Sequence, residues 1–153
     1  MLAQQKTLDN EPEQALHDAL LELNQDLHES FINDELSGTT ACVAMMHNND
    51  VIVSNVGDSR AVLARELEDG SLVTEDLTRD QTPFRDDECE RVKGYGARIL
   101  TLDQIEGLKD PNVRCWTVES ECDGDPPRLW APDAFYPGTA FTRSIGDSSK
   151  FMY

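Results

Sequence analysis

The chain has 153 residues, of which 39% are hydrophobic and 28% are charged. This length and composition favour one folded domain with a hydrophobic core, and they exclude a disordered or fibrous protein. Thirteen basic residues against thirty acidic ones give a net charge of -17, which disfavours nucleic acid and anionic membrane surfaces as partners.

The first predicted element is an amphipathic helix from Glu11 to Asn33, preceded by an N-terminal tail at residues 1–10. Asn10 is suited to cap this helix, and Pro12 is suited to its first turn. A coiled-coil dimer is the competing explanation of its apolar stripe, which otherwise packs on the rest of the chain. The stripe consists of apolar residues at steps of three or four positions: Leu16, Leu20, Leu23, Leu27 and Phe31.

Short β-rich runs follow Gly38, and turn residues separate them. The turns are short enough to join antiparallel neighbours, so the stretch is predicted to form a four-stranded meander. The alternation of apolar and polar residues is imperfect, which indicates strands covered on both faces, by a helix on one side and a second sheet on the other. The four runs are residues 39–46, 51–56, 61–67 and 72–77.

The second half of the chain is predicted to add a helix, a strand and a hairpin. Residues 84–93 begin acidic and end basic, which complements a helix dipole. Residues 98–102 are predicted to form a strand, and residues 113–118 to pair with residues 127–131 around a polar turn. No repeat, low-complexity tract or linker supports a second domain.

The sequence contains no signal-peptide core, and no apolar run approaches the roughly 18 residues of a membrane span. We therefore expect an intracellular protein, cytoplasmic or nuclear, with reduced thiols and no membrane association. The four cysteines contain no CxxC pair of the kind found in zinc knuckles. A bridge between Cys115 and Cys122 across the predicted hairpin stays open as an alternative.

A series of short motifs follows one order along the chain. Each motif is weak alone, but together, over a helix–meander–helix–strand pattern from about Ala15 to Lys150, they resemble the protein phosphatase 2C family. They are Ser-Gly-Thr-Thr-Ala at residues 37–41, Gly-Asp-Ser-Arg within residues 55–63, Thr-Arg-Asp-Gln within residues 77–83, Glu-Arg-Val within residues 88–92 with Gly-Ala-Arg-Ile at residues 96–99, and Ser-Ile-Gly-Asp within residues 137–147.

This resemblance implies an α+β fold, in which residues 11–153 form the central and incomplete part of an α-β-β-α sandwich. It also implies a metal-dependent protein serine/threonine phosphatase that acts on phosphoserine and phosphothreonine proteins. In that family a pair of Mg²⁺ or Mn²⁺ ions, held by aspartates at one end of the sandwich, binds the water that attacks the phosphoryl group. Two metals suit this chemistry because they lower the pKa of the water and stabilise charge on the transferring oxygens.

Asp58 is the one residue to which the resemblance transfers a metal contact. Gly57 suits the positive φ of a tight turn, and Asp58 then presents a carboxylate at the strand ends. The residues alone leave another interpretation open, in which Asp58 hydrogen-bonds its own turn and Arg60 forms a structural ion pair. The resemblance favours the metal role, because the family's aspartate in this motif lies beside the metal cluster and serves an additional metal site.

Two other polar segments invite a functional interpretation that we do not adopt. Residues 37–40 are small and hydroxylated like a phosphate-binding loop, but they lack a lysine and lead into a strand instead of a helix. For Arg143 and Asp147, the resemblance implies a structural role over direct metal ligation.

The histidines and tryptophans give no separate site. His17, His28 and His47 are too scattered for a metal trio or a Ser–His–Asp arrangement, and we expect them on the surface. Trp116 and Trp130 are expected to pack the late hairpin.

Several family segments have no counterpart in this sequence: the early Asp-Gly-His-Gly-Gly, an upstream phosphate-binding arginine, the later Asp-Gly-x-Trp-Asp and a terminal Asp-Asn pair. The usual histidine of the central segment is Gln81 here. Two hypotheses follow, namely a phosphatase fragment that lacks its main metal ligands, and a non-catalytic regulatory or binding module. The fragment hypothesis is favoured. A sandwich cut at both ends would expose strand edges and apolar faces, and a protein that exists alone would be expected to cover them. The sequence sets no oligomeric state.

Overall fold

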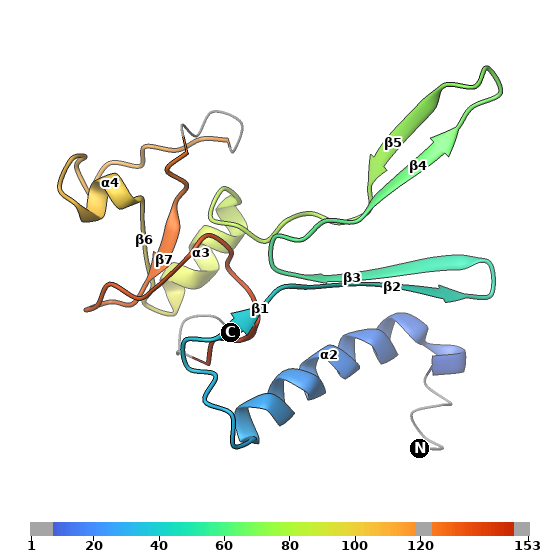
Figure 1. Cartoon of the computed structure of the whole chain (residues 1–153), viewed down its shortest axis with the longest axis horizontal. Coiled ribbons are helices and arrows are strands. Elements are labelled where there is room, and N and C mark those ends of the chain that lie inside the picture. Colours follow the sequence, from blue (N-terminus) through green and yellow to red (C-terminus); the bar gives the residue numbers. More distant parts are fainter. Residues whose placement is uncertain (1–7, 119–123, 149–153) are drawn as a thin grey trace.

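The computed structural model of the chain describes residues 8–118 and 124–148. All the strand pairs in these ranges are antiparallel, and helices accompany them, so the predicted mixed α+β class is confirmed (Figure 1). In chain order the elements are α2 (Pro12–Glu29), β1 (Gly38–Thr39), β2 (Ala41–His47), β3 (Asp50–Val56), β4 (Val62–Glu66), β5 (Leu72–Asp76), α3 (Asp86–Gly94), β6 (Arg98–Leu100), α4 (Leu102–Ile105), β7 (Arg128–Trp130), β8 (Pro137–Thr139) and β9 (Ile145–Gly146).

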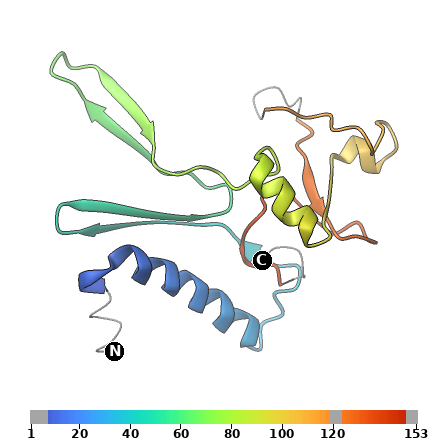
Figure 2. The ribbon, with the colours of Figure 1, turned by 180° about the vertical axis from the view of Figure 1, so that it is seen from behind.

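Helix α2 lies along the β2–β3 hairpin in both views (Figures 1 and 2), and it contacts β3 and β9. It is shorter than predicted, and Asn10 does not cap it, because Glu11 occupies the N-cap position. Pro12 occupies the first turn as expected. The helix ends at Ser30, where the backbone becomes extended, so Phe31 leaves the apolar stripe and is 99% exposed.

The predicted four-stranded meander consists of two separate hairpins. Strands β2 and β3 pair in the register Ala41↔Val56 to His47↔Asp50, and β4 and β5 pair from Val62↔Asp76 to Glu66↔Leu72. Within residues 8–118, no ladder joins β3 to β4. The hairpins diverge from the link between β3 and β4 (Figure 1), because the backbone of this link bonds to residue 81 instead of to a neighbouring strand.

The prediction that these strands are covered on both faces is wrong. Every residue of β4 and β5 is exposed, and β2 alternates between half-buried and exposed positions. Helix α2 covers only one side of one hairpin, which leaves large apolar side chains of both hairpins in contact with solvent. They are Met46, Val51, Val62, Leu63, Leu72 and Val73.

The hydrophobic core lies in the second half of the chain, between α3 and the β6–β7–β8 sheet. Helix α3 begins with acidic and ends with basic residues, as predicted. The buried core cluster is Cys89, Val92, Ala97, Ile99, Trp116 and Leu129, with Phe84 and Phe141 packed against it.

Two predictions for this half are wrong, namely the hairpin between residues 113–118 and 127–131 and the extent of the strand at residues 98–102. Strand β7 pairs with β6 and β8, so the hairpin between residues 113–118 and 127–131 does not form. Cys115 carries a free thiol, and Cys122 lies outside the described residues. Strand β6 ends at Leu100, because Thr101 forms a capping box with Gln104 and starts α4.

None of the helices among the described residues is both long enough and apolar enough to cross a membrane.

Candidate functional site

The predicted metal residue, Asp58, directly follows Gly57 in the link where the two hairpins separate. Gly57 is buried and has a φ of +96°, which favours glycine. A Cβ atom at this position would lie 2.4 Å from Cγ2 of Thr40 and 3.2 Å from the carbonyl oxygen of Arg143. Both the conformation and the available space therefore require glycine immediately before the aspartate.

Gln81 holds the backbone of Gly57 from both sides. Its side-chain Oε1 accepts a hydrogen bond of 2.7 Å from the Gly57 N–H, and its backbone N–H donates to the Gly57 carbonyl over 2.9 Å. Its Nε2 donates to the carbonyl of Asn55 over 3.2 Å. The Gln81 carbonyl in turn accepts from the Thr142 N–H over 2.8 Å, so the turn is tied to the C-terminal segment. In the sequence, Gln81 stands out only as a departure from the family pattern.

The predicted motif at residues 37–41 contacts the same turn. The hydroxyls of Thr40 and Ser59 are 2.7 Å apart and share a hydrogen bond. The Asn55 side chain donates to the Gly57 carbonyl over 3.0 Å. The start of β2 thus supports the turn, which agrees with a structural role for the Ser-Gly-Thr-Thr segment.

The carboxylate of Asp58 itself is exposed and makes no hydrogen bond or ion pair within residues 8–118 and 124–148. The alternative in which Asp58 hydrogen-bonds its own turn is therefore wrong. The other half of that alternative is confirmed, since Arg60 forms two parallel bonds of 2.9 Å to the carboxylate of Asp80. Arg60 of the turn is therefore held in an ion pair with Asp80, whereas Asp58 has no partner among the described residues.

An oxygen ligand on a rigid turn has the donor chemistry that Mg²⁺ and Mn²⁺ prefer, and Mg²⁺ is often held by one or two carboxylates with water completing its shell. Asp58 fits the role of one such ligand. Across the described ranges, however, no group of three His, Cys, Asp or Glu residues converges in a way that could hold a metal ion. Asp58 alone does not make a two-metal site.

Glu88 of α3 is buried and lies at the centre of an ionic cluster with Arg91 and Arg143. Its carboxylate accepts from Arg91 and Arg143, each with an N–O distance of 2.8 Å, and from the hydroxyl of Thr142. Burial raises the pKa of Glu88. The hydrogen bonds from Arg143, Arg91 and Thr142 outweigh burial and lower this pKa to about 2. The cluster fixes Arg143, as the structural interpretation of that residue expects.

Asp147 directly follows β9, which pairs with β1 in the register Gly38↔Gly146. It is 4% exposed, and its backbone N–H donates to the Ser37 carbonyl. A Cβ atom at Gly38 would lie 2.2 Å from the Asp147 carboxylate, so the glycine of the Ser-Gly-Thr-Thr motif makes room for this buried acid. This placement also agrees with a structural role.

His28 is a correction to the predicted surface histidines. It is half-buried at the end of α2, where Nε2 lies 2.9 Å from the Asn24 amide nitrogen and Nδ1 contacts the carboxylate of Asp34. Burial raises the pKa of Asp34, but hydrogen bonds from Ser148 and His28 outweigh it, so the pKa lies below its usual value. Asn24 also links α2 to β9, because its side-chain oxygen accepts from the Gly146 N–H, and Asp34 binds the hydroxyl of Ser148 in the segment after β9.

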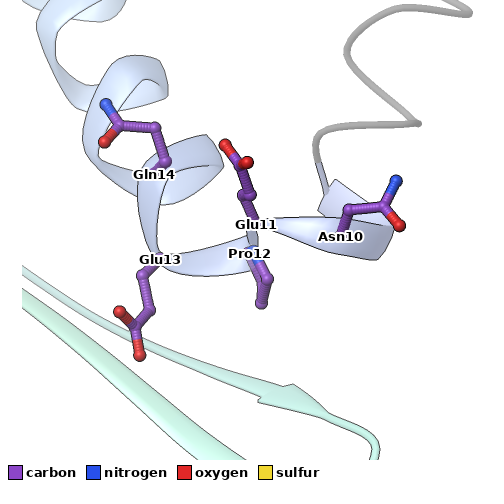
Figure 3. Close-up of a pocket in the computed structure, with 5 residues that line it drawn as sticks. All are labelled: Asn10, Glu11, Pro12, Glu13 and Gln14. Carbon is purple, nitrogen blue, oxygen red and sulfur yellow. The ribbon is translucent and has the colours of Figure 1, made fainter.

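Two hollows lie beside α2. One of about 590 Å³ lies at the start of α2 and is lined by residues 10–14 alone. The side chains of Glu11 and Glu13 point in different directions there (Figure 3), so no polar groups converge on a ligand. The second, of about 320 Å³, lies between α2, β3 and β9. Asn55, Gln81 and Arg143 line it, whereas Asp58 does not.

The family model described as Protein phosphatase 2C matches residues 1–152. The chain belongs to the protein phosphatase 2C family. It is 54% identical over 147 residues to "Probable protein phosphatase 2C 35" of Arabidopsis thaliana, covering 96% of this chain and 42% of that relative. It is 39% identical over 120 residues to "Probable protein phosphatase 2C 73" of the same plant, covering 78% of this chain and 27% of that relative.

A solved structure supports the protein phosphatase 2C fold independently. The crystal structure of a serine-threonine phosphatase 2C from Toxoplasma gondii matches with a TM-score of 0.67 at 20% identity, over 97% of this chain and 44% of that chain. The predicted fold, part of the family's layered α+β architecture, is therefore confirmed. The chain spans less than half the length of each of these relatives.

Proposed function

We propose that residues 11–153 are the central segment of a Mg²⁺- or Mn²⁺-dependent protein serine/threonine phosphatase domain, in which Asp58 serves as a metal ligand. The observation that carries this proposal is the carboxylate of Asp58, which has no partner among the described residues and follows a turn whose backbone is held at Gly57. Membership of the protein phosphatase 2C family and the names of its relatives support the reaction class.

In this proposal the chain contributes geometry to the catalytic step. Gly57 fixes the direction in which the Asp58 carboxylate leaves the turn, and Gln81 with Thr40 holds Gly57 in place. Bound divalent cations lower the pKa of a water and stabilise charge on the transferring phosphoryl oxygens. Because Asp58 makes no competing hydrogen bond to the residues that the structure describes, its carboxylate is able to bind a cation or to accept a hydrogen bond from cation-bound water.

The remaining metal ligands are assigned to sequence outside this segment. No three suitable side chains converge among the described residues, and one carboxylate does not assemble a two-metal site. The segment on its own is therefore expected to be inactive. We assign it protein substrates that carry phosphoserine or phosphothreonine, in the cytoplasm or nucleus, and no nucleic-acid partner because the net charge is -17.

A second candidate function is a non-catalytic, phosphatase-like binding or regulatory module. The lack of a converging ligand group within residues 8–118 and 124–148 favours it. The two functions differ in what a longer protein containing this segment does. A phosphatase hydrolyses a phosphothreonine peptide only when Mn²⁺ or Mg²⁺ is present, whereas a binding module retains the peptide and leaves its phosphate intact.

The experiment is a titration of Mn²⁺ against phosphopeptide hydrolysis by the full-length protein and its Asp58→Asn variant. Asparagine keeps the shape of the side chain and removes the charge that attracts a cation. We expect a higher Mn²⁺ requirement and a lower rate in the variant, with an unchanged melting temperature. An unchanged Mn²⁺ requirement would contradict the metal role of Asp58, and metal-independent or absent hydrolysis by the unmodified protein would contradict the proposed reaction.

A further inference from the structure

We infer that Gln81 is a positioning residue for Asp58, one that sets the divalent-cation affinity of the turn through the backbone of Gly57. The inference rests on the proposed metal role of Asp58 and assigns Gln81 a part in it. Gln81 lies 24 positions after Gly57 in the sequence, yet three of its four hydrogen-bonding groups bond to Gly57 or Asn55, and the fourth, its carbonyl, accepts from Thr142.

The side-chain amide of Gln81 makes the two hydrogen bonds that a neighbouring strand would otherwise make with the end of β3. It accepts from the N–H of Gly57 over 2.7 Å and donates to the C=O of Asn55 over 3.2 Å. These two groups lie at the end of β3, where the chain leaves its ladder with β2, and no strand within residues 8–118 and 124–148 pairs with the other side of β3. A primary amide suits this position because it carries an acceptor oxygen and a donor nitrogen on the same planar group.

These bonds affect the direction of the Asp58 carboxylate because they hold the backbone of a glycine. Gly57 adopts a φ of +96°, and glycine populates positive and negative φ about equally when it is not constrained. The residue next along the chain is Asp58, so a change in the Gly57 backbone turns the carboxylate toward a different region. Thr40 and Arg143 restrict the space around Gly57, while Gln81 fixes its peptide groups.

Gln81 is also the point where the turn joins the ionic cluster of Glu88. Its carbonyl accepts from the Thr142 N–H over 2.8 Å, and the Thr142 hydroxyl donates to Glu88. The backbone of Gln81 keeps these bonds whatever side chain it carries. Replacing the side chain therefore separates the positioning of Gly57 from the general attachment of the segment.

The test compares Mn²⁺ binding, measured by calorimetry in the full-length protein, among Gln81→Met, Asp58→Asn and the double variant. Methionine keeps the length and removes both amide bonds. Loss of a group that orients a metal ligand typically weakens metal affinity about 10- to 100-fold, and we expect Gln81→Met to fall in this range. If Gln81 acts through Asp58, the double variant is no weaker than Asp58→Asn alone, since coupled residues are non-additive.

Two further variants keep the result interpretable if Gln81→Met loses stability. Gln81→Glu retains an acceptor for Gly57 but places a second oxygen against the Asn55 carbonyl, so it is also expected to weaken binding. Gln104→Met is the matched control, because Gln104 is 4% exposed and bonds to Thr101, Asp110 and Val113 in α4 and the loop after it. This control is expected to lower the melting temperature and to leave Mn²⁺ affinity unchanged.

The outcomes separate the inference from the proposed function. Equal Mn²⁺ affinity in Gln81→Met and the unmodified protein, with Asp58→Asn weakened, would overturn the positioning role and leave the metal role intact. Equal affinity in Asp58→Asn and the unmodified protein would overturn both. Hydrogen exchange gives a reading without activity, since the Gly57 amide should exchange faster in Gln81→Met than in Gln104→Met.

Discussion

Replacing Gly57 by alanine tests the geometry of the turn most directly. Alanine at a φ of +96° enters a region that costs an ordinary residue about 1–2 kcal/mol. The added methyl group would also lie 2.4 Å from Cγ2 and 2.9 Å from Cβ of Thr40. Overpacking of this kind typically costs about 1–3 kcal/mol, so we expect Gly57→Ala to lower the free energy of unfolding by about 2–5 kcal/mol.

Gly70 supplies the matched control for this substitution. It has a similar φ of +81° in the loop between β4 and β5, but no atom lies within 4 Å of where its Cβ would be. Gly70→Ala is therefore expected to cost only the conformational part, about 1–2 kcal/mol. The reduced entropy of the unfolded chain affects both variants alike, so it cancels when they are compared.

Urea denaturation followed by tryptophan fluorescence measures this difference. Trp116 and Trp130 are both buried, 7% and 6% exposed, and they report on the core. The turn is coupled to that core through Gln81, whose carbonyl accepts from the Thr142 N–H. Equal losses of stability in Gly57→Ala and Gly70→Ala would refute the conclusion that Thr40 and Arg143 enclose the glycine.

Three further predictions concern the ionic cluster, the capping box and the reaction. Because the pKa of Glu88 is lowered from 4.5 to about 2, its contribution to stability is present above about pH 4.5 and is lost as the pH falls toward 2. Acid titration of the melting temperature should show this slope, and Glu88→Gln should be less stable at neutral pH with a flatter dependence; identical slopes would contradict the cluster. Thr101→Ala removes the hydroxyl that accepts from the Gln104 N–H, and it should cost about 1 kcal/mol in urea denaturation. A loss below the measurement error would show that the capping box does not stabilise α4. The 153-residue chain alone should give only background Mn²⁺-dependent hydrolysis of a phosphopeptide, and robust activity of pure material would refute the assignment of further ligands to other sequence.

Much of the secondary structure follows from local signals. The leucine periodicity predicts α2, and the acidic start at Asp86 and Asp87 marks α3. Glycine and asparagine turns predict both hairpins. Where local signals competed, the prediction was wrong: residues 98–102 look β-rich, but Thr-x-x-Gln from Thr101 to Gln104 is itself a capping-box signature that was available in the sequence.

The candidate site divides in the same way. The Gly-Asp-Ser-Arg motif pointed to Asp58, and the structure places that carboxylate on a constrained turn, with no competing partner in the described part of the chain. The supporting contacts were not predicted. Gln81 belongs to the Thr-Arg-Asp-Gln motif, but nothing in the local sequence indicates that it bonds to Gly57, and only the tertiary structure shows this contact.

By itself, the sequence determined most of the helices and strands, namely α2, the two hairpins and α3, together with the turns between them and the glycine that precedes Asp58. These properties depend on backbone preferences and neighbours a few positions away. The tertiary structure alone decided that β7 joins β6 and β8, that the two hairpins separate, and that Glu88 and Gln81 hold segments 55 and 24 residues distant. Such pairings follow from packing and from the need of buried polar groups for hydrogen-bond partners. Both act between residues that lie far apart in the sequence.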